Sequence, residues 1–199
     1  MNMIFQAMRP AVSVFVLLSA ITGLAYPLLV TGVAQAVFAH AANGSLVEVN
    51  GQAVGSSLIG QSFTDAKYFW SRPSATGTLA NNGAASGGSN LGANNPALLD
   101  AVTGRIAALR AADPGNTLLV PIDLVTASGS GLDPDISLAA AHYQAPRIAR
   151  VRGLSIDTVK ALIAQHAQTP WLGVVGEPRV NVLALNLALN AQLGASPAR

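Results

Sequence analysis

The chain has no cysteine, and only 10% of its 199 residues are charged. Without cysteine it can form no disulfide, no thiolate metal site and no cysteine nucleophile. Average protein sequences carry about 25% charged residues, so this is not the composition of an ordinary soluble globular protein. The 11 Lys and Arg residues are scattered among 9 Asp and Glu residues and form no basic run, which argues against a nucleic-acid-binding protein.

Apolar residues, in contrast, are abundant. They make up 51% of the chain, the mean hydropathy is +0.43 and the formal net charge is only +2. Such a composition excludes an intrinsically disordered chain, which needs low hydrophobicity and high net charge. The length allows either one large domain or a membrane anchor followed by one domain.

The longest uncharged stretch lies near the N-terminus and predicts a transmembrane helix. No Asp, Glu, Lys or Arg occurs from position 10 to position 47, and the 28 residues from 11 to 38 are its most apolar part. About 20 apolar residues span a bilayer, so this stretch is long enough for one tilted pass. We assign residues 1–9 to an N-terminal stub and residues 10–38 to the membrane helix, with a kink at Pro27.

Two other interpretations of this stretch remain open. Ala39-His40-Ala41 resembles a signal-peptidase site, so the stretch could be a cleaved leader of a secreted protein whose mature chain starts near Ala42 or Asn43. The apolar run is much longer than the roughly 7–15 residues of a signal peptide, which favours a retained helix. A buried core helix is the second alternative.

Flanking charge predicts the orientation of the helix. Arg9 is the only charged residue before it, and the next charged residue after it is Glu48. The positive-inside rule therefore places the N-terminus in the cytoplasm and residues 39–199 outside it, in the periplasm if the cell has an outer membrane.

Small residues within the helix predict contact with another helix. They occur in two pairs with a spacing of four, Ser19 with Gly23 and Gly32 with Ala36. Small residues at this spacing let two membrane helices approach closely.

Residues 39–199 are predicted to form one α+β domain with a small sheet. Apolar and polar residues alternate over 44–70 around Asn50-Gly51, which indicates a β-hairpin. Asn95 and Pro96 form a helix start, and residues 113–115 end that helix. The other predicted elements are loops at 81–94 and 126–134, a short buried strand at 118–120, and helices at 137–152 (broken at Pro146), 156–167 and 181–193.

The sequence offers little support for catalysis. His40, His142 and His166 are far apart and form no zinc-binding motif, and no G-x-S-x-G motif of a serine hydrolase occurs. Asp133 and Asp135 flank Pro134, a pattern that fits a turn better than an acid pair. We therefore predict no metal site and no catalytic residues.

Two features could bind an anion. The loop Ser86-Gly87-Gly88-Ser89-Asn90 could cradle a phosphate with its backbone N–H groups, but it lacks the Walker pattern and is better explained as a flexible or tightly turned loop. Arg72 and Arg179 could bind an anion, but structural ion pairs are the more common role for such arginines.

Nine blocks of sequence, spread almost from end to end of the chain, occur in a recognisable order: 9–10, 22–28, 43–46, 58–63, 68–75, 85–91, 125–133, 146–149 and 180–189. In these blocks and their order the chain resembles the KdpC family, the C subunit of bacterial potassium-transporting P-type ATPases. The resemblance implies a non-catalytic accessory subunit in the bacterial inner membrane. Its partners would be the channel-like A subunit, the ATP-hydrolysing B subunit and the small F subunit.

The resemblance also implies a role as a catalytic chaperone that raises the ATP affinity of the B subunit. ATP would then be a ligand shared with that subunit, with Ser86 to Asn90 as the candidate contact in this chain. The predicted orientation conflicts with direct contact, because the pump hydrolyses ATP in the cytoplasm. The alternative from a different class is a membrane-anchored extracytoplasmic binding or assembly module unrelated to ion pumping.

Overall fold

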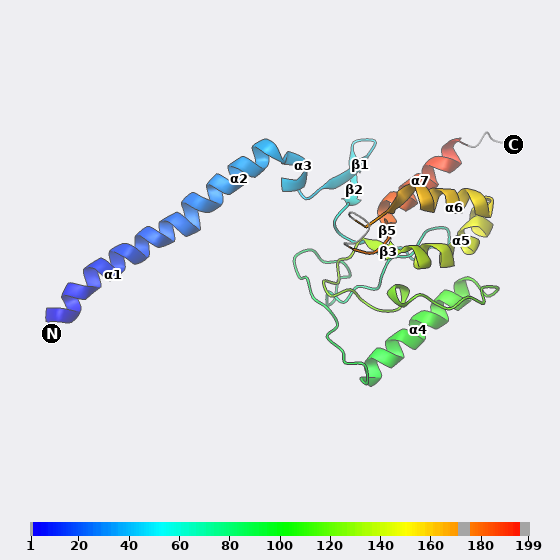
Figure 1. Cartoon of the computed structure of the whole chain (residues 1–199), viewed down its shortest axis with the longest axis horizontal. Helices are drawn as coiled ribbons and strands as arrows, with labels where there is room; N and C mark the ends of the chain where they lie inside the picture. Colours follow the sequence, from blue (N-terminus) through cyan, green and yellow to red (C-terminus); the bar gives the residue numbers. More distant parts are fainter. Residues whose placement is uncertain (1, 171–175, 196–199) are drawn as a thin grey trace. The chain divides into compact units, whose positions relative to one another are not determined.

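The protein is described here by a computed structural model that covers residues 2–170 and 176–195. The chain divides into two compact units, Met1–Leu46 and Val47–Arg199. The first unit is almost entirely helical, and the second combines helices with short strands (Figure 1). Both parts of the predicted fold class, an N-terminal apolar helix and an α+β domain, are confirmed.

The N-terminal unit is one long helix followed by a short one. Helix α1 (Asn2–Ala20), the π-helical turn η1 (Ile21–Ala25) and helix α2 (Tyr26–Val37) are continuous, and α3 (Ala39–Ala42) follows. Residues Gln6–Val37, 32 in number, are long and apolar enough to cross a membrane, and none of this segment's most apolar window is buried within the protein. The lack of burial argues against the core-helix interpretation.

Pro27 accounts for the irregular turn inside this helix. Proline lacks the N–H that would bond to the carbonyl of Gly23, and its ring would collide with that carbonyl in a regular α-helix. The π turn relieves the collision, and the N–H of Tyr26 bonds to the carbonyl of Ile21 five residues earlier. The hydroxyl of Thr22 donates to the Leu18 carbonyl at 2.8 Å within the same region. The predicted irregularity at Pro27 therefore takes the form of a π turn.

The second unit starts with the predicted hairpin. Strands β1 (Leu46–Val49) and β2 (Gln52–Ser56) are joined by Asn50 and Gly51. These two residues have φ angles of 53° and 77°, the left-handed region that a two-residue hairpin turn of type I′ requires and that Asn-Gly adopts readily.

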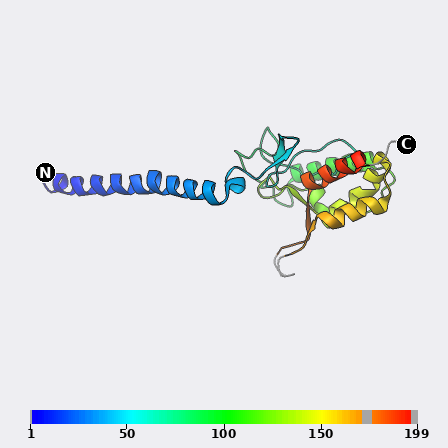
Figure 2. The ribbon, with the colours of Figure 1, turned by 90° about the horizontal axis from the view of Figure 1, so that it is seen from above.

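A three-stranded antiparallel sheet and three helices form the core. The strand order is β3 (Asp135–Ser137), β5 (Arg179–Asn181), β4 (Ala167–Gln168), with Ile136 opposite Val180. Helix α6 (Ile156–His166) packs against both α5 (Leu138–Arg152) and α7 (Val182–Ala195), and all three helices contact β5. Figure 2 shows the helices from a second direction. Helix α4 (Pro96–Ala112) and the 3-10 turn η2 (Ile122–Leu124) add Leu109 and Leu124 to the core.

Side-chain caps set the helix starts. The side chains of Asn95, Ser137 and Ser155 accept hydrogen bonds from backbone N–H groups in the first turns of α4, α5 and α6. Gly153, with a φ of 65°, ends α5 in the left-handed conformation typical of a helix C-terminus. The predicted helix boundaries at these positions are confirmed.

The predicted break of the helix at Pro146 is wrong, because α5 is continuous through it. Proline frees the carbonyl of His142 one turn earlier. Both residues lie on the exposed face of α5, where water can satisfy that carbonyl. The buried face, which includes Ala145, Ile148 and Ala149, holds the helix against its neighbours.

The predicted buried strand at 118–120 is also wrong. These residues form no strand, and the exposed fractions of Leu118 and Leu119 are 58% and 92%. The side chain of Asn116 explains this local path. Its oxygen accepts from the Leu118 N–H at 3.1 Å, and its nitrogen donates to the Tyr143 carbonyl at 2.9 Å. The apolar side chains of Leu118 and Leu119 therefore suggested a burial that the tertiary structure does not provide.

Candidate functional site

The segment at 69–72, which follows a turn at 65–68, lies against the buried core without a strand partner. Its backbone groups still need hydrogen bonds, because an unpaired polar group costs free energy when it is buried. Phe69 in this segment is completely buried. The N–H and carbonyl of Phe69 therefore need hydrogen-bond partners within the protein.

Two side-chain amides take the place of a neighbouring strand. Asn186 of α7 accepts from the Phe69 N–H at 2.8 Å and donates to the Phe69 carbonyl at 3.0 Å. Gln144 of α5 does the same for Trp70, accepting from its N–H at 2.8 Å and donating to its carbonyl at 3.1 Å. Each amide thus reproduces both hydrogen bonds that an antiparallel strand would make with one residue.

Arg147 completes this arrangement, which we call the backbone clamp (Gln144, Arg147 and Asn186). Its guanidinium donates to the carbonyls of Ala66 and Tyr68 and to Gln144, and its carbon atom Cζ lies 4.7 Å from the centre of the Trp70 ring. The residue is only 2% exposed. Burial lowers the pKa of Arg147 to about 10, so the side chain remains cationic at neutral pH.

The clamp was not predicted from the sequence, although it leaves a visible signal there. Asn186 interrupts the otherwise apolar run from Val182 to Leu189, and Gln144 and Arg147 are three residues apart on the buried face of a helix. Buried polar side chains in such positions are hydrogen-bonded. Which backbone they bind depends on a fold that brings residues 69 and 186 together.

The two arginines predicted to bind anions both form ion pairs. Arg72 donates to the carboxylate of Asp133 at 2.9 Å, and Arg179 lies 2.9 Å from the carboxylate of Asp135. The structural role that the sequence favoured for both is confirmed. Burial raises the pKa of Asp135, and the neighbouring Arg179 opposes that rise only in part.

A pocket of about 250 Å³ lies beside these pairs and is lined by both arginines together with four acidic residues. Three of the four already have protein partners. Asp123 accepts from the N–H and hydroxyl of Ser137, and the other two are the ion-paired Asp133 and Asp135. Within the described residues, no group of three or more His, Cys, Asp or Glu side chains could hold a metal ion.

The glycine-rich loop predicted as a phosphate cradle packs against the loop at 128–131. The N–H of Gly87 and the hydroxyl of Ser86 both donate to the carbonyl of Ser130, at 2.9 and 3.1 Å. Gly131 has a φ of 68°, and a Cβ atom there would lie 2.6 Å from the carbonyl oxygen of Gly87. Part of the predicted cradle is thus used to hold two loops together. Ser89 and Asn90 are exposed.

The small residues of the long helix have no packing role within this chain. A Cβ atom at Gly23 or at Gly32 would meet nothing within 4 Å. Ser19 is exposed and Ala36 is also free of burial. Nine residue steps separate Gly23 from Gly32 and the first of them lie in the π turn, so the two glycines lie on different faces of the helix.

These features define a class of protein: an α+β domain that follows one helix long and apolar enough to cross a membrane. Three polar side chains in its interior, Gln144, Arg147 and Asn186, hydrogen-bond to the backbone of the segment at 66–70. Comparison with known proteins identifies the family within this class.

The chain belongs to the KdpC family. Residues 8–191 match the family model described as "K+-transporting ATPase, c chain". A "Potassium-transporting ATPase KdpC subunit" of Variovorax paradoxus is 66% identical over 190 residues, which is 96% of this chain and 98% of the relative. Proteins with the same name from Polaromonas naphthalenivorans and Janthinobacterium sp. are 65% and 63% identical, over 92% of this chain and 94% and 96% of their own lengths. The predicted family resemblance is confirmed.

Proposed function

We propose that this chain is an accessory, non-catalytic subunit of an ATP-driven potassium uptake pump in the bacterial inner membrane. The family match over residues 8–191 carries the proposal. The 32-residue apolar helix supports it, because a helix with no burial inside its own chain needs an apolar environment, which a membrane and a partner helix supply. Its partners are the channel-like A subunit, the ATP-hydrolysing B subunit and the small F subunit.

The domain at 39–199 stands outside the cytoplasm in this proposal, with residues 1–9 inside and 10–38 crossing the membrane. Arg9, which lies in helix α1 directly before the uncharged stretch that starts at position 10, supports this orientation through the positive-inside rule. Ser19 with Gly23, and Gly32 with Ala36, provide two surfaces where a neighbouring helix can approach closely. Glycine in a helix costs roughly 1 kcal/mol relative to alanine, and nothing within this chain requires it at these positions.

Co-purification tests the accessory-subunit proposal. The full chain with a C-terminal tag is expressed with its genomic neighbours, extracted in mild detergent and captured, and the bound proteins are identified by mass. We expect a P-type ATPase and a channel-like subunit in constant ratio to the chain. Capture of the chain alone, or with other membrane proteins, would favour an assembly module unrelated to pumping.

The second part of the proposal, drawn from the family resemblance, is that the subunit raises the ATP affinity of the B subunit. Ser86 to Asn90 are the candidate segment for nucleotide contact, and direct contact requires the domain to lie in the cytoplasm, the reverse of the orientation proposed above. If the loop does contact the nucleotide, replacing Ser89 by Ala together with Asn90 by Gly should raise the KM for ATP of the assembled pump without changing its amount. Thr78→Ala, in another exposed loop, is the matched control. An unchanged KM in the double variant would remove this loop from the proposal.

A further inference from the structure

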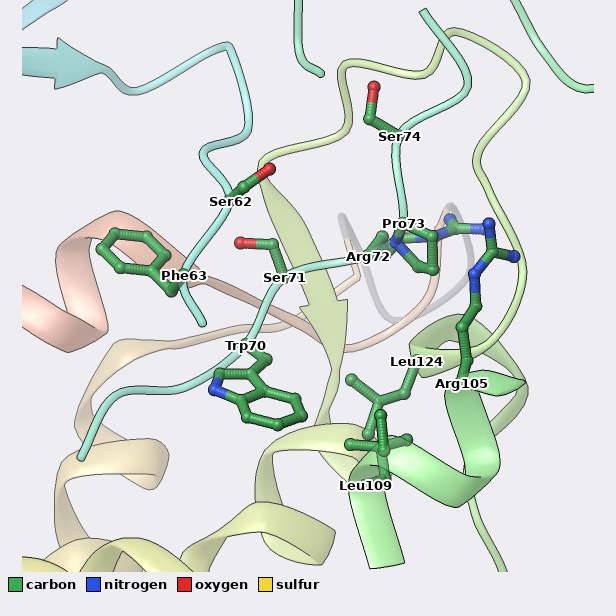
Figure 3. Close-up of a pocket in the computed structure, with 11 residues that line it drawn as sticks. Ser62, Phe63, Trp70, Ser71, Arg72, Pro73, Ser74, Arg105, Leu109 and Leu124 are labelled. Atoms are coloured by element: carbon green, nitrogen blue, oxygen red, sulfur yellow. The ribbon is translucent and has the colours of Figure 1, made fainter. Parts of the chain in front are cut away.

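A separate pocket of about 210 Å³ lies between α4, the segment at 62–74 and the turn η2. Its walls are largely apolar and include Phe63, Trp70, Leu109 and Leu124 (Figure 3). Leu109 and Leu124 belong to the buried core, and the backbone clamp fixes the backbone of Trp70. The pocket is therefore a rigid feature of the domain.

Two guanidinium groups line the same pocket, and no acidic residue does. Arg72 belongs to the segment at 69–72 and Arg105 to α4, and Figure 3 shows both near Pro73. Their charges are unequally compensated. Arg72 is paired with Asp133, whereas Arg105 has no carboxylate partner in the described part of the chain and donates only to the Val125 carbonyl, at 2.7 Å.

Both arginines keep unused hydrogen-bonding capacity. A guanidinium has five N–H donors, and the one hydrogen bond of Arg105 leaves most of them available. The Nε atom of Arg72 is buried and finds no acceptor among the described protein atoms. Burial also lowers the pKa of Arg105, as expected for a cation that has lost water without gaining an anion.

The size of the pocket limits what can enter. Drug-sized ligands and cofactors occupy pockets of about 300–1,000 Å³, so a whole nucleotide exceeds this space. A cavity of about 150 Å³ is enough for benzene, so one ring or a branched alkyl group fits with a small polar group attached. The guanidinium fork matches the planar geometry of a carboxylate.

We propose that this pocket binds a carboxylate on a short apolar stem, with Arg105 as the principal anion-binding residue and Phe63, Trp70 and Leu109 around the stem. The carboxylate belongs either to a free organic acid or to an acidic side chain of a protein segment. This inference is independent of the proposed role in ATP affinity and of the loop at 86–90.

Binding of defined probes to the full chain in lipid nanodiscs tests the proposal. The first probe is 3-phenylpropanoate, and its matched neutral control is 3-phenylpropanamide. The second is a blocked dipeptide, N-acetyl-phenylalanyl-glutamate amide, whose only carboxylate is the side chain. Titration calorimetry gives the affinity, and the indole N–H signal of Trp70 reports by NMR whether the probe enters this pocket.

Binding of either acid with a shift of the Trp70 signal supports the proposal. Binding of the propanoate alone indicates a free acid as the natural ligand, and binding of the dipeptide alone indicates a protein segment. The amide should bind at least about tenfold more weakly than the acid, because it loses a charge-assisted hydrogen bond. Equal affinity of acid and amide, or no binding of either acid, would overturn the proposal.

Variants with matched controls test whether Arg105 and the wall of the pocket bind the acid. Arg105→Gln should weaken binding of the acid about tenfold, whereas Arg110→Gln, an exposed arginine on the same helix, should leave it unchanged. Ala108→Leu narrows the pocket from its edge, and Ala107→Leu places the same side chain on the exposed surface outside the lining. We expect loss of binding for Ala108→Leu only. Retained binding in both Arg105→Gln and Ala108→Leu would also refute the site. If Arg105→Gln fails to fold, the comparison of Ala108→Leu with Ala107→Leu still tests it.

Discussion

Asn186 makes both backbone hydrogen bonds of Phe69, a residue 117 positions earlier in the chain, at distances of 2.8 and 3.0 Å. Gln144 makes the corresponding pair with Trp70. A chain segment that would ordinarily be a strand is therefore held by side chains of two helices. The arrangement leaves the side chain of Trp70 free to form one wall of a pocket.

Replacing Asn186 by Leu should destabilise the domain by about 3 kcal/mol, because the N–H and carbonyl of buried Phe69 lose their partners. Chemical denaturation of the full chain, followed by tryptophan fluorescence, measures the change. Asn190→Leu is the matched control, since Asn190 is exposed one turn further along α7 and contacts only Arg152 among its described partners. Equal effects of the two variants would show that the clamp contributes little.

Arg147→Lys should destabilise nearly as much as Arg147→Met, because a single ammonium group cannot bridge the Ala66 and Tyr68 carbonyls and Gln144 as the guanidinium does. Thermal melts of the three proteins at fixed pH provide the measurement. A lysine variant as stable as the wild type would mean that charge alone matters.

The clamp should not depend on pH between 5 and 9. The pKa of Arg147 is lowered by burial to about 10, below its value in the unfolded chain. The cost of burying this cation is therefore constant while the group is charged in both states, and it decreases only as the pH rises through about 10. Comparing the denaturation midpoints of wild type and Arg147→Met across pH 5–9 should give a constant difference. A difference that varies with pH in this range would contradict the assignment.

Neutralising Asp133 and Asp135 to Asn should leave the pump's apparent potassium affinity and its discrimination against sodium unchanged. Both carboxylates are occupied by arginines, and residues from position 40 onward carry 10 basic against 9 acidic side chains, a formal charge of +1 that cannot attract cations. Potassium-dependent ATPase activity of the assembled complex measures both properties. A loss of either with assembly intact would show that the domain handles the ion.

Replacing Asp135 alone has an expected effect on stability. Because burial raises the pKa of Asp135, its ionised form is disfavoured in the folded state, and this cost is present at neutral pH and disappears as the pH falls through the folded pKa. Asp135→Asn alone should therefore change stability at pH 7 by less than about 1 kcal/mol. A larger loss would mean that its pairing with Arg179 outweighs the cost of burial.

Protease added to intact spheroplasts should digest residues 45–199 and leave the membrane stub, if the domain lies outside the cytoplasm. Immunoblotting with antibodies against each end of the chain distinguishes the fragments. Protection in intact spheroplasts and digestion only after lysis would reverse the orientation and bring the domain to the side where ATP is.

Gly23→Leu and Gly32→Leu should each weaken assembly with the other pump subunits without preventing membrane insertion. Their positions on different helix faces predict two separate contacts, so the combined variant should lose more than either single one. Val33→Leu is the control for added bulk. Co-purified subunit ratios measure assembly, and a full complement of partners in all three glycine variants would refute the contacts.

Local patterns allowed much of this fold to be predicted from sequence. The Asn50-Gly51 turn and the helix starts at Asn95-Pro96 and at residue 156 depend on neighbouring residues only, and they were located correctly. The strand predicted at 118–120 failed because burial depends on what packs above a segment, which no local pattern contains. For the same reason, the sequence predicted that Arg72 forms an ion pair but not that its partner is Asp133. The partner and the pocket beside the pair can be seen only in the tertiary structure.

The two hydrogen bonds between the Phe69 backbone and the Asn186 side chain also constrain how the domain folds during synthesis. Its central segment is synthesised long before the helix that satisfies it, so the buried polar groups of Phe69 have no permanent partner while the chain is still emerging. Closing a loop of 117 residues is slow compared with forming local helices and hairpins. The domain should therefore complete its folding only after the last helix has left the ribosome, and a chain that stops before residue 186 should be recognised by proteases as unfolded.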